Sequence, residues 1–383
     1  MDAQAIETPI TSLPLKRGPT RMDEIDQIVD LYYLEAVFGE PHDRKTNGAG
    51  SYCYIGTPYR CDLRGTEISD WVDRLSADVS RTFPTEEDFR IEFEGRSFRG
   101  CRDRSGISTE VALRRLPDTV PLLAELDFEN KCVRKLLEAT WLNNGGLVVI
   151  SGLTGQGKTV VAGAAIRSRL EAWGGRAVTT EDPPELPLEG FWGHGSCRQL
   201  EVTYDERDPF KNGFAGAIRR AYRKLPATRP AILFVGEIRD SETATELLKA
   251  AINGMIVVCT VHAMDPVAAI RRIASLAEPV LGDAAAGLVS QALRLVVHNR
   301  LTLHAERPGW KRGQFTSSIL LSDGEAHPVA ATLREGRYAQ LATLINFQAA
   351  HLKAADADNM SASDLLLKLG SRAPELQHQP GRK

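Results

Sequence analysis

The eight residues that begin at Gly152 have the spacing of a phosphate-binding loop. Their sequence, GLTGQGKT, matches the pattern GxxxxGK[ST] at every fixed position. An apolar run, LVVIS, precedes them and a small-residue stretch, VVAGAAI, follows, so the loop is expected to join a strand to a helix. Backbone N–H groups of such a loop and the positive end of the helix dipole bind phosphate groups. The segment therefore predicts a nucleotide site.

Two side chains of this loop have predicted roles of their own. Lys158 would neutralise charge on the β- and γ-phosphates of ATP, and the Thr159 hydroxyl would ligate Mg²⁺. Phosphate loops also occur in kinases, GTPases and passive nucleotide sensors, so the loop alone does not define the reaction. The full predicted nucleotide-binding set is Gly152, Leu153, Thr154, Gly155, Gln156, Gly157, Lys158, Thr159 and Val160.

Three more segments place polar residues at the ends of apolar runs, where the ligands of open α/β sheets collect. Glu181 can there orient or deprotonate the water that attacks the γ-phosphate. Glu237 is the first acid of its segment and can bind the Mg²⁺ shell. Alternatively, Glu181 is a solvated loop acid, Glu237 a turn or helix-cap residue, and His262 merely structural. The segments are EDPPE at 181–185, ILFVGEIRD at 232–240 and VCTVHA at 258–263.

The order and spacing of these segments resemble those of the secretion-ATPase superfamily. This superfamily includes pilus retraction ATPases such as PilT, type II secretion ATPases, and type IV secretion ATPases such as DotB. The resemblance covers roughly residues 96–370. It implies ATP hydrolysis with ATP and Mg²⁺ as cofactors, a catalytic Glu181, an atypical Walker B acid at Glu237, and a His262 that senses hydrolysis near the γ-phosphate.

The resemblance also implies arginines supplied to a neighbouring subunit. Phosphoryl transfer often needs such an arginine, which accelerates the reaction by about 10³–10⁵. IRRAYR at 218–223 resembles the LRxxLR segment of the family, and ALRRLP at 112–117 resembles its FRxIP segment. Arg114, Arg219 and Arg223 have no evident partner within their own segments, so we expect a homohexameric ring with ATP between subunits. Solvated surface charges are the alternative for these arginines.

Other features favour one branch of the superfamily. A C-terminal segment, ATLREGR, resembles the NLIREGK segment of the family, whereas the four-cysteine metal module of the type II branch is absent. The first 95 residues do not reproduce the opening strand of PilT-type proteins. We therefore expect a type IV secretion or conjugation motor, with pilus retraction as the alternative. A DNA-translocating ATPase and a non-hydrolysing regulatory subunit are more distant alternatives.

The elements that position these residues follow from hydrophobic patterning. In the first part of the chain, we expect a helix over 23–38, strands within 52–64, a helix over 67–81, a hairpin from 90–93 and 96–101, and a strand over 111–116. Together these elements predict a small α+β domain, and the resemblance implies that it is PAS-like.

From Leu126 onward, short apolar strands alternate with helical stretches. The expected strands are 147–151, 177–180, 232–235 and 255–260. This pattern predicts the α/β class with a parallel sheet covered on both faces, and the resemblance implies a RecA-like P-loop NTPase motor domain. The expected divisions are a flexible leader at 1–20, the α+β domain at 21–120, the motor at 121–370 and a disordered tail at 371–383.

Composition limits the partners. The net charge of the 383 residues is -3, so no global positive field predicts direct nucleic-acid binding. No apolar run approaches the roughly 20 residues that a membrane helix needs, and the start lacks a signal-peptide core. The six cysteines form no CxxC pair and are expected to be reduced. We expect a cytoplasmic protein, peripheral at the inner face of the cytoplasmic membrane, that contacts the membrane only through inner-membrane components of its machine.

Overall fold

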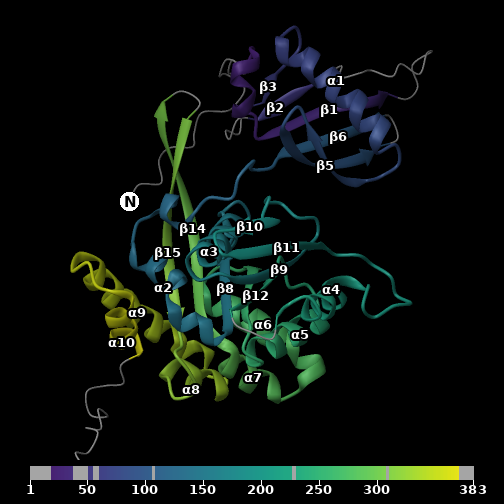
Figure 1. The fold of residues 1–383 in the computed structure, drawn as a ribbon. Coiled ribbons are helices and arrows are strands. Elements are labelled where there is room, and N and C mark those ends of the chain that lie inside the picture. The colour runs from purple at the N-terminus through teal and green to yellow at the C-terminus, as the bar shows by residue number, and fades with distance from the viewer. Residues whose placement is uncertain are drawn as a thin grey trace, which may run out of the picture. The chain divides into compact units, whose positions relative to one another are not determined.

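The chain folds into two compact units, seen here in a computed structural model (Figure 1). The first comprises Met1–Asp118 with Ala305–Trp310, and the second comprises Thr119–His304 with Lys311–Lys383. Among the described residues, no helix has both the length and the apolar character needed to span a membrane. The predicted tail and nearly all of the predicted leader lie outside the described residues, which are 19–37, 51–54, 60–105, 108–226, 230–307 and 310–370.

The first unit is an antiparallel sheet on which helix α1 packs. Its strand order is β3-β2-β1-β6-β5-β4. Helix α1 (Glu67–Thr82) buries the stripe Ile68, Trp71, Val72, Leu75 and Val79. The predicted helix over 67–81, the predicted hairpin and the predicted strand over 111–116 are confirmed. The strands are β1 (Asp30–Val37), β2 (Tyr52–Tyr54), β3 (Cys61–Asp62), β4 (Asp88–Phe93), β5 (Arg96–Arg104) and β6 (Ser108–Arg115).

The predicted helix over 23–38 is wrong. The segment forms a short 3-10 helix, Met22–Gln27, followed by strand β1. The apolar residues from Ile25 to Tyr32 match a helical period, but Leu31 and Tyr33 are fully buried on one side of the sheet. Strand β1 pairs antiparallel with β6 along most of its length. The pairing with β6, which is distant in sequence, therefore determined the structure of this segment, although its apolar residues have a helical period.

The second unit is built on a mainly parallel sheet. Its strand order is β10-β11-β9-β12-β13-β8-β14-β15-β7, and the neighbouring strands from β11 to β14 run parallel. The four predicted strands are confirmed as β8, β9, β12 and β13. The strands are β7 (Asp127–Phe128), β8 (Gly146–Gly152), β9 (Gly175–Glu181), β10 (Gly190–Trp192), β11 (Gly195–Glu201), β12 (Ala231–Val235), β13 (Ile256–His262), β14 (Leu293–Arg307) and β15 (Trp310–Leu321).

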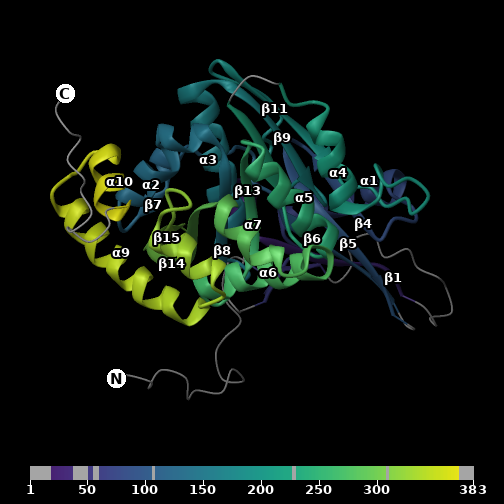
Figure 2. The ribbon, with the colours of Figure 1, turned by 90° about the horizontal axis from the view of Figure 1, so that it is seen from below.

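Helices cover both faces of this sheet, which confirms the predicted α/β class (Figures 1 and 2). Alternate residues of β12 lie in the two hydrophobic cores, one on each face of the sheet. Leu233 belongs to the core that contains α4 to α7, whereas Phe234 belongs to the core that contains α2 and α3. The helices are α2 (Cys132–Glu138), α3 (Lys158–Trp173), α4 (Gly213–Tyr222), α5 (Ser241–Ile252), α6 (Pro266–Leu281), α7 (Ala284–Ala292), α8 (Pro328–Arg334), α9 (Leu341–Ala357) and α10 (Ala362–Gly370).

Candidate nucleotide site

The carboxyl ends of four adjacent parallel strands bring the predicted residues to one edge of the sheet. His262 at the end of β13 is in register with Gly152 at the end of β8. Val235 at the end of β12 is in register with Thr180 of β9, so Glu237 and Glu181 follow at the same level. The phosphate loop, Glu181, Glu237 and His262 therefore lie along one edge.

Two of these side chains share the sheet face on which α3 packs. Residues two apart in a strand lie on the same face. Glu181 is therefore on the face of Ala177, and His262 on the face of Val258, both of which pack in the core cluster that contains α3. Helix α3 begins at Lys158, directly after the phosphate loop. The acid and the histidine thus lie on the side where bound phosphates would sit.

The phosphate loop has the backbone shape that its glycines permit. Gly155 and Gly157 have φ of +76° and +68°. A side chain at Gly157 would also place its Cβ 2.8 Å from the Phe315 ring of β15. The Leu301 N–H of β14 donates to Gln156 Oε1 at 2.6 Å. Strands β14 and β15 therefore support the loop from behind, a contact that the motif itself does not reveal.

The rest of the loop is open to a ligand. Leu153, Thr154 and Gly155 are exposed, and Thr159 and Val160 are half-buried in the first turn of α3. The free N–H groups of a helix N-terminus attract anions. The exposed part of the loop is therefore accessible to an anion, and nucleotide binding by the whole set stays a prediction.

Lys158 and His262 are in direct contact, although 104 positions separate them in the chain. The Lys158 ammonium donates to the Leu153 carbonyl at 2.8 Å and lies 3.3 Å from His262 Nδ1. Because an ammonium group only donates, Nδ1 must accept, and the neutral imidazole carries its proton on Nε2. Burial and the charge of Lys158 lower the pKa of His262, which favours this neutral form. Burial also lowers the pKa of Lys158, whereas the negative charges of Glu185 and Glu237 act to raise it.

Glu181 is not a solvated loop acid, because its side chain is only 3% exposed. Its Oε1 accepts hydrogen bonds from the Thr179 hydroxyl at 2.5 Å and the Gln199 amide at 2.8 Å. Burial raises the pKa of Glu181, and these two hydrogen bonds act in the opposite direction. The sequence motifs did not identify Thr179 or Gln199 as part of the site.

Glu237 belongs to a chain of charged and polar contacts. Arg239 binds both of its carboxylate oxygens, and the hydrogen bond from Arg239 is the main reason that the pKa of Glu237 is lowered. The same guanidinium lies 3.6 Å from Asp182, which also accepts a hydrogen bond from the Tyr204 hydroxyl at 2.7 Å. Asp182 and Arg239 stand in the EDPPE and GEIRD motifs, which is where closer inspection of the sequence could have found them.

The donor set fits a magnesium ion. Thr159 and Glu237 offer a hydroxyl and an ionised carboxylate, and Mg²⁺ prefers oxygen ligands. In nucleotide sites Mg²⁺ takes one or two protein ligands and completes its shell with water and phosphate oxygens. Thr159 follows Lys158 in the first turn of α3, and the charge of Glu237 raises the pKa of Lys158. The metal role of both residues stays a prediction.

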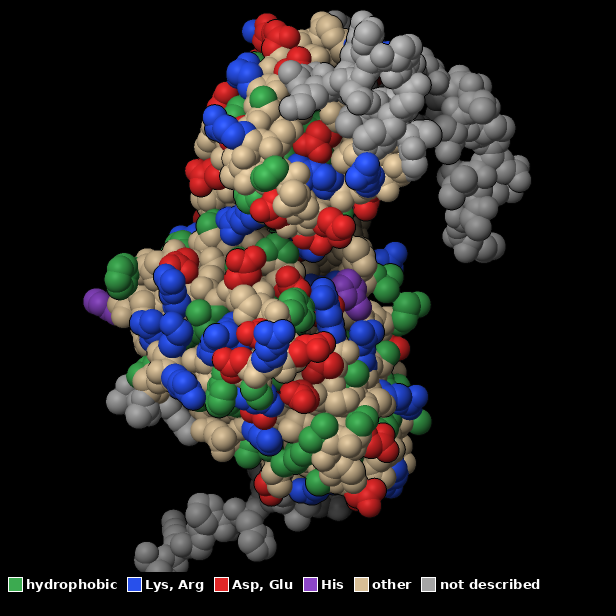
Figure 3. Space-filling model, turned by 90° about the vertical axis from the view of Figure 1, so that its right-hand side faces the viewer, with side chains coloured by type: hydrophobic (Ala, Val, Ile, Leu, Met, Phe, Trp, Pro, Cys, Tyr) green, Lys and Arg blue, Asp and Glu red, His purple; other side chains and the backbone are tan. Residues whose placement is uncertain are grey.

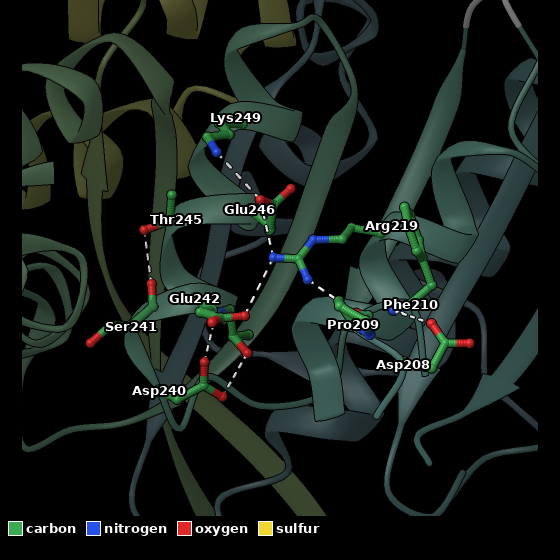
Figure 4. A network of polar contacts seen from close by, with 11 residues as sticks. Asp208, Pro209, Phe210, Arg219, Asp240, Ser241, Glu242, Thr245, Glu246 and Lys249 are labelled. Carbon is green, nitrogen blue, oxygen red and sulfur yellow. Dashed lines mark hydrogen bonds and ion pairs between the residues drawn. The ribbon is translucent and has the colours of Figure 1, made fainter. Parts of the chain in front are cut away.

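Arg219 has partners outside its own segment, which the sequence did not identify. Its guanidinium donates to the Pro209 carbonyl at 3.1 Å and to Glu242 at 3.3 Å, and it lies 3.6 Å from Glu246 (Figure 4). These contacts tie α4 to α5. The local sequence could not show them, because both acids lie on a later helix.

The other two arginines also have contacts of their own. Arg114 lies on β6 of the first unit, where its Nε donates to Asp30 at 2.8 Å. Arg223 is exposed at the end of α4, and its guanidinium stacks on the Phe210 ring with 4.5 Å to the ring centre.

The amino-acid sequence of the chain is similar to those of known proteins. A family model described as "Type II/IV secretion system protein" matches residues 80–349. The type II secretion system protein HxcR of Pseudomonas aeruginosa is 34% identical over 170 residues, which are 43% of this chain and 32% of HxcR. The uncharacterized protein YggR of Escherichia coli is 28% identical over 286 residues, 73% of this chain and 78% of YggR. The chain thus matches about a third of the length of HxcR.

Solved structures show the same fold. The pilus retraction motor PilT with bound ADP has a TM-score of 0.62 and 22% identity, over 92% of this chain and 96% of PilT. The ATPase DotB of Legionella pneumophila has a TM-score of 0.60 and 18% identity, over 94% of this chain and 96% of DotB. At these identities the likeness shows that both units follow the fold of these proteins.

Proposed function

The chain belongs to the type II/IV secretion system protein family, whose model matches more than half of its residues, and on that basis we propose that it is an ATP-hydrolysing motor of a secretion machine. One observation carries the proposal. A complete phosphate loop and the residues Lys158, Glu181, Glu237 and His262 lie along one edge of a parallel sheet, where Lys158 contacts His262. A passive nucleotide sensor needs the loop but has no use for a buried acid at the same edge.

Each residue has a distinct task in this proposal. Backbone N–H groups of the loop bind the phosphates, and Lys158 neutralises their charge. Glu181 holds the attacking water and accepts its proton, which requires the ionised carboxylate. His262 carries its proton on Nε2 and can donate it in a hydrogen bond to the γ-phosphate. Loss of that phosphate would remove this partner, and His262 would thereby report hydrolysis.

Thr159 and Glu237 would hold Mg²⁺. When bound, the ion neutralises charge on the β- and γ-phosphate oxygens. Arg239 already neutralises Glu237 on one side, so it competes with the ion for the carboxylate and keeps Glu237 ionised. When Glu237 binds the ion, the Arg239 guanidinium could pair with Asp182 instead.

We further propose a homohexameric ring in which an arginine reaches the nucleotide of the next subunit. Arg223 is the best candidate, because its guanidinium is exposed and stacks on a ring instead of joining α4 to α5. Arg219 is engaged with Glu242 and Glu246, and a role in trans would require it to leave them. Arg114 would act from the first unit, after exchange of its contact with Asp30.

The proposed machine is a type IV secretion or conjugation system, which the motor serves from the cytoplasmic face through inner-membrane partners. The likeness to DotB over nearly the whole chain supports this assignment. The similar likeness to PilT supports pilus retraction as the second candidate. Deletion of the gene in its host separates the two: loss of substrate transfer supports the first, and loss of pilus retraction supports the second.

Direct action on DNA is a more distant candidate. Figure 3 shows Lys and Arg side chains interspersed with Asp and Glu on the face it presents, without a continuous basic stripe. A DNA translocase needs a basic path for the phosphate backbone. Stimulation of ATP hydrolysis by DNA would revive this alternative.

The decisive test is ATP turnover by the purified full chain and by Lys158→Ala. We expect the wild type to hydrolyse ATP and the variant to retain at most a few per cent of that rate, because the phosphate charge is no longer neutralised. Circular dichroism melts check folding, and Lys224→Ala, at an exposed lysine, is the matched control. A wild type without turnover, or an active Lys158→Ala, would contradict the proposed function.

A further inference from the structure

Three polar side chains gather at the end of strands β9 and β11. Thr179 and Gln199 are register partners across the parallel pair, and Glu181 follows Thr179 by two residues. All three therefore lie on the same face of the sheet, the face that packs on α3. The pairing explains how a glutamine from β11 reaches an acid of β9.

Both neutral side chains bind the same carboxylate oxygen of Glu181. The fully buried Thr179 hydroxyl donates to Oε1 at 2.5 Å, and the Gln199 amide donates to Oε1 at 2.8 Å. The backbone N–H of Glu185 also donates a hydrogen bond to this carboxylate. Hydrogen bonds that involve a charged group are short and directional, so the pair fixes the rotation of the carboxylate.

The other end of the Gln199 side chain holds the loop after β9. Its Oε1 accepts the backbone N–H groups of Leu188 and Glu189, each at 3.0 Å. Because an amide oxygen only accepts, these bonds settle which end of the amide faces Glu181. The same loop is docked on α3 by Leu186, whose Cδ1 would lie 2.5 Å from a Cβ at Gly163. Gln199 thus links the buried acid to the helix that starts at the phosphate loop.

We propose that Thr179 and Gln199 are positioning residues that hold Oε1 of Glu181 and thereby fix the orientation in which the carboxylate meets the water that attacks ATP. This role rests on the proposed function, in which Glu181 accepts the proton of that water. The donors also favour the ionised carboxylate, against burial and against the charge of Glu185, which faces Glu181. The Cys197 thiol faces it as well and stays neutral, because burial raises its pKa to about 12.

The test compares Thr179→Val, which removes the hydroxyl and keeps the shape, with Thr179→Ser, which keeps the hydroxyl. We expect Thr179→Val to lower kcat about tenfold to a hundredfold, while Thr179→Ser stays near the wild type. The acid limb of the kcat profile should move to higher pH in Thr179→Val, because loss of a donor raises the pKa of a carboxyl. Equilibrium binding of a fluorescent ATP analogue, measured without turnover, should stay within about threefold of the wild type, since neither Thr179 nor Gln199 belongs to the phosphate loop.

Gln199→Met provides a second variant at a half-buried position, in case the buried Thr179→Val fails to fold. It should show the same loss of kcat and the same shift of the acid limb. Unchanged kcat and an unchanged acid limb in the folded variants, next to an inactive Glu181→Gln, would overturn the positioning role and leave the proposed function intact. Normal turnover by Glu181→Gln would instead remove Glu181 from the mechanism, and the positioning role with it.

Discussion

Replacement of Glu181 by glutamine separates the charge of this side chain from its shape. The glutamine Oε1 can still accept the hydrogen bonds that Thr179 and Gln199 donate to the native carboxylate. An amide does not accept a proton from water, so general-base assistance is lost. Such assistance is worth about 10²–10⁴ in rate, or about 2.7–5.5 kcal/mol of barrier. We therefore expect kcat to fall by at least about a hundredfold.

Two other properties should survive this replacement. Glu181 contributes no donor to the phosphates, so the affinity for ATP should remain within about tenfold, or about 1.4 kcal/mol. Folding should not suffer either, because the variant buries a neutral amide in place of a carboxylate that is 3% exposed. A loss of activity without a loss of binding or stability is the signature of a catalytic acid–base residue.

The stability difference should depend on pH in a defined direction. Burial raises the pKa of Glu181 above its ordinary value of 4.5, so the folded state binds this proton more tightly than the unfolded state. The group therefore destabilises the fold as pH rises through and above 4.5, and Glu181→Gln removes that penalty. The variant should melt at the same temperature as the wild type at pH 4 and above it at pH 8.

The assay measures steady-state phosphate release, equilibrium binding of a fluorescent ATP analogue, and thermal melts from pH 4 to 8. Each 1 kcal/mol of added stability should raise Tm by about 2–4 °C for a unit of this size. Glu181→Asp is the matched control, since it keeps the charge but withdraws it by one methylene. Turnover by Glu181→Gln within about threefold of the wild type would refute the catalytic role, and a lower Tm at pH 8 would refute the argument from burial.

Four further outcomes are expected. Glu237→Gln should raise the Mg²⁺ concentration needed for half-maximal ATPase activity about tenfold or more, and an unchanged Mg²⁺ titration would exclude Glu237 from the metal shell. In an NMR titration, ADP should raise the pKa of His262, because added phosphate charge favours the imidazolium; an unchanged pKa would place the ring away from the phosphates. Mixed rings of Lys158→Ala and Arg223→Ala subunits, each inactive alone, should regain some turnover. An Arg219→Ala subunit should instead lose about 1 kcal/mol of stability through its partly buried ion pairs with Glu242 and Glu246. Mixing that fails to rescue Arg223→Ala would remove the trans role.

The phosphate loop and the strands of the motor unit could be predicted from the sequence because their signals are local. The GxxxxGK[ST] spacing reflects contacts between the loop and a ligand, which need no distant residue. The largely apolar runs that became β8, β9, β12 and β13 indicate strands buried on both faces wherever they occur in a chain. The order of the polar motifs then placed the acids and the histidine at strand ends, since successive parallel strands present the same edge.

Contacts between residues that are distant in sequence determined features that hydrophobic periodicity could not predict. The segment that became β1 matched a helical repeat, but its partner β6 lies about 80 positions later and imposed alternation. The arginines of α4 were judged against their neighbours in sequence, whereas Glu242 and Glu246 approach Arg219 from another helix. A sequence period tells which side of an element is apolar, but not which element covers it.

For the chemistry of the site too, the sequence supplies the residue types and the tertiary structure supplies the contacts between them. From its sequence alone, this protein has a phosphate loop, two candidate acids and a histidine in a fixed order. Only the tertiary structure brings Lys158 against His262 across 104 positions and thereby defines the tautomer of the ring. It also buries Glu181 beneath Thr179 and Gln199, which lie on neighbouring strands. Residue types set which reactions are possible, whereas strand order and register set which side chains meet, because contact energy depends on distances that the chain acquires only on folding.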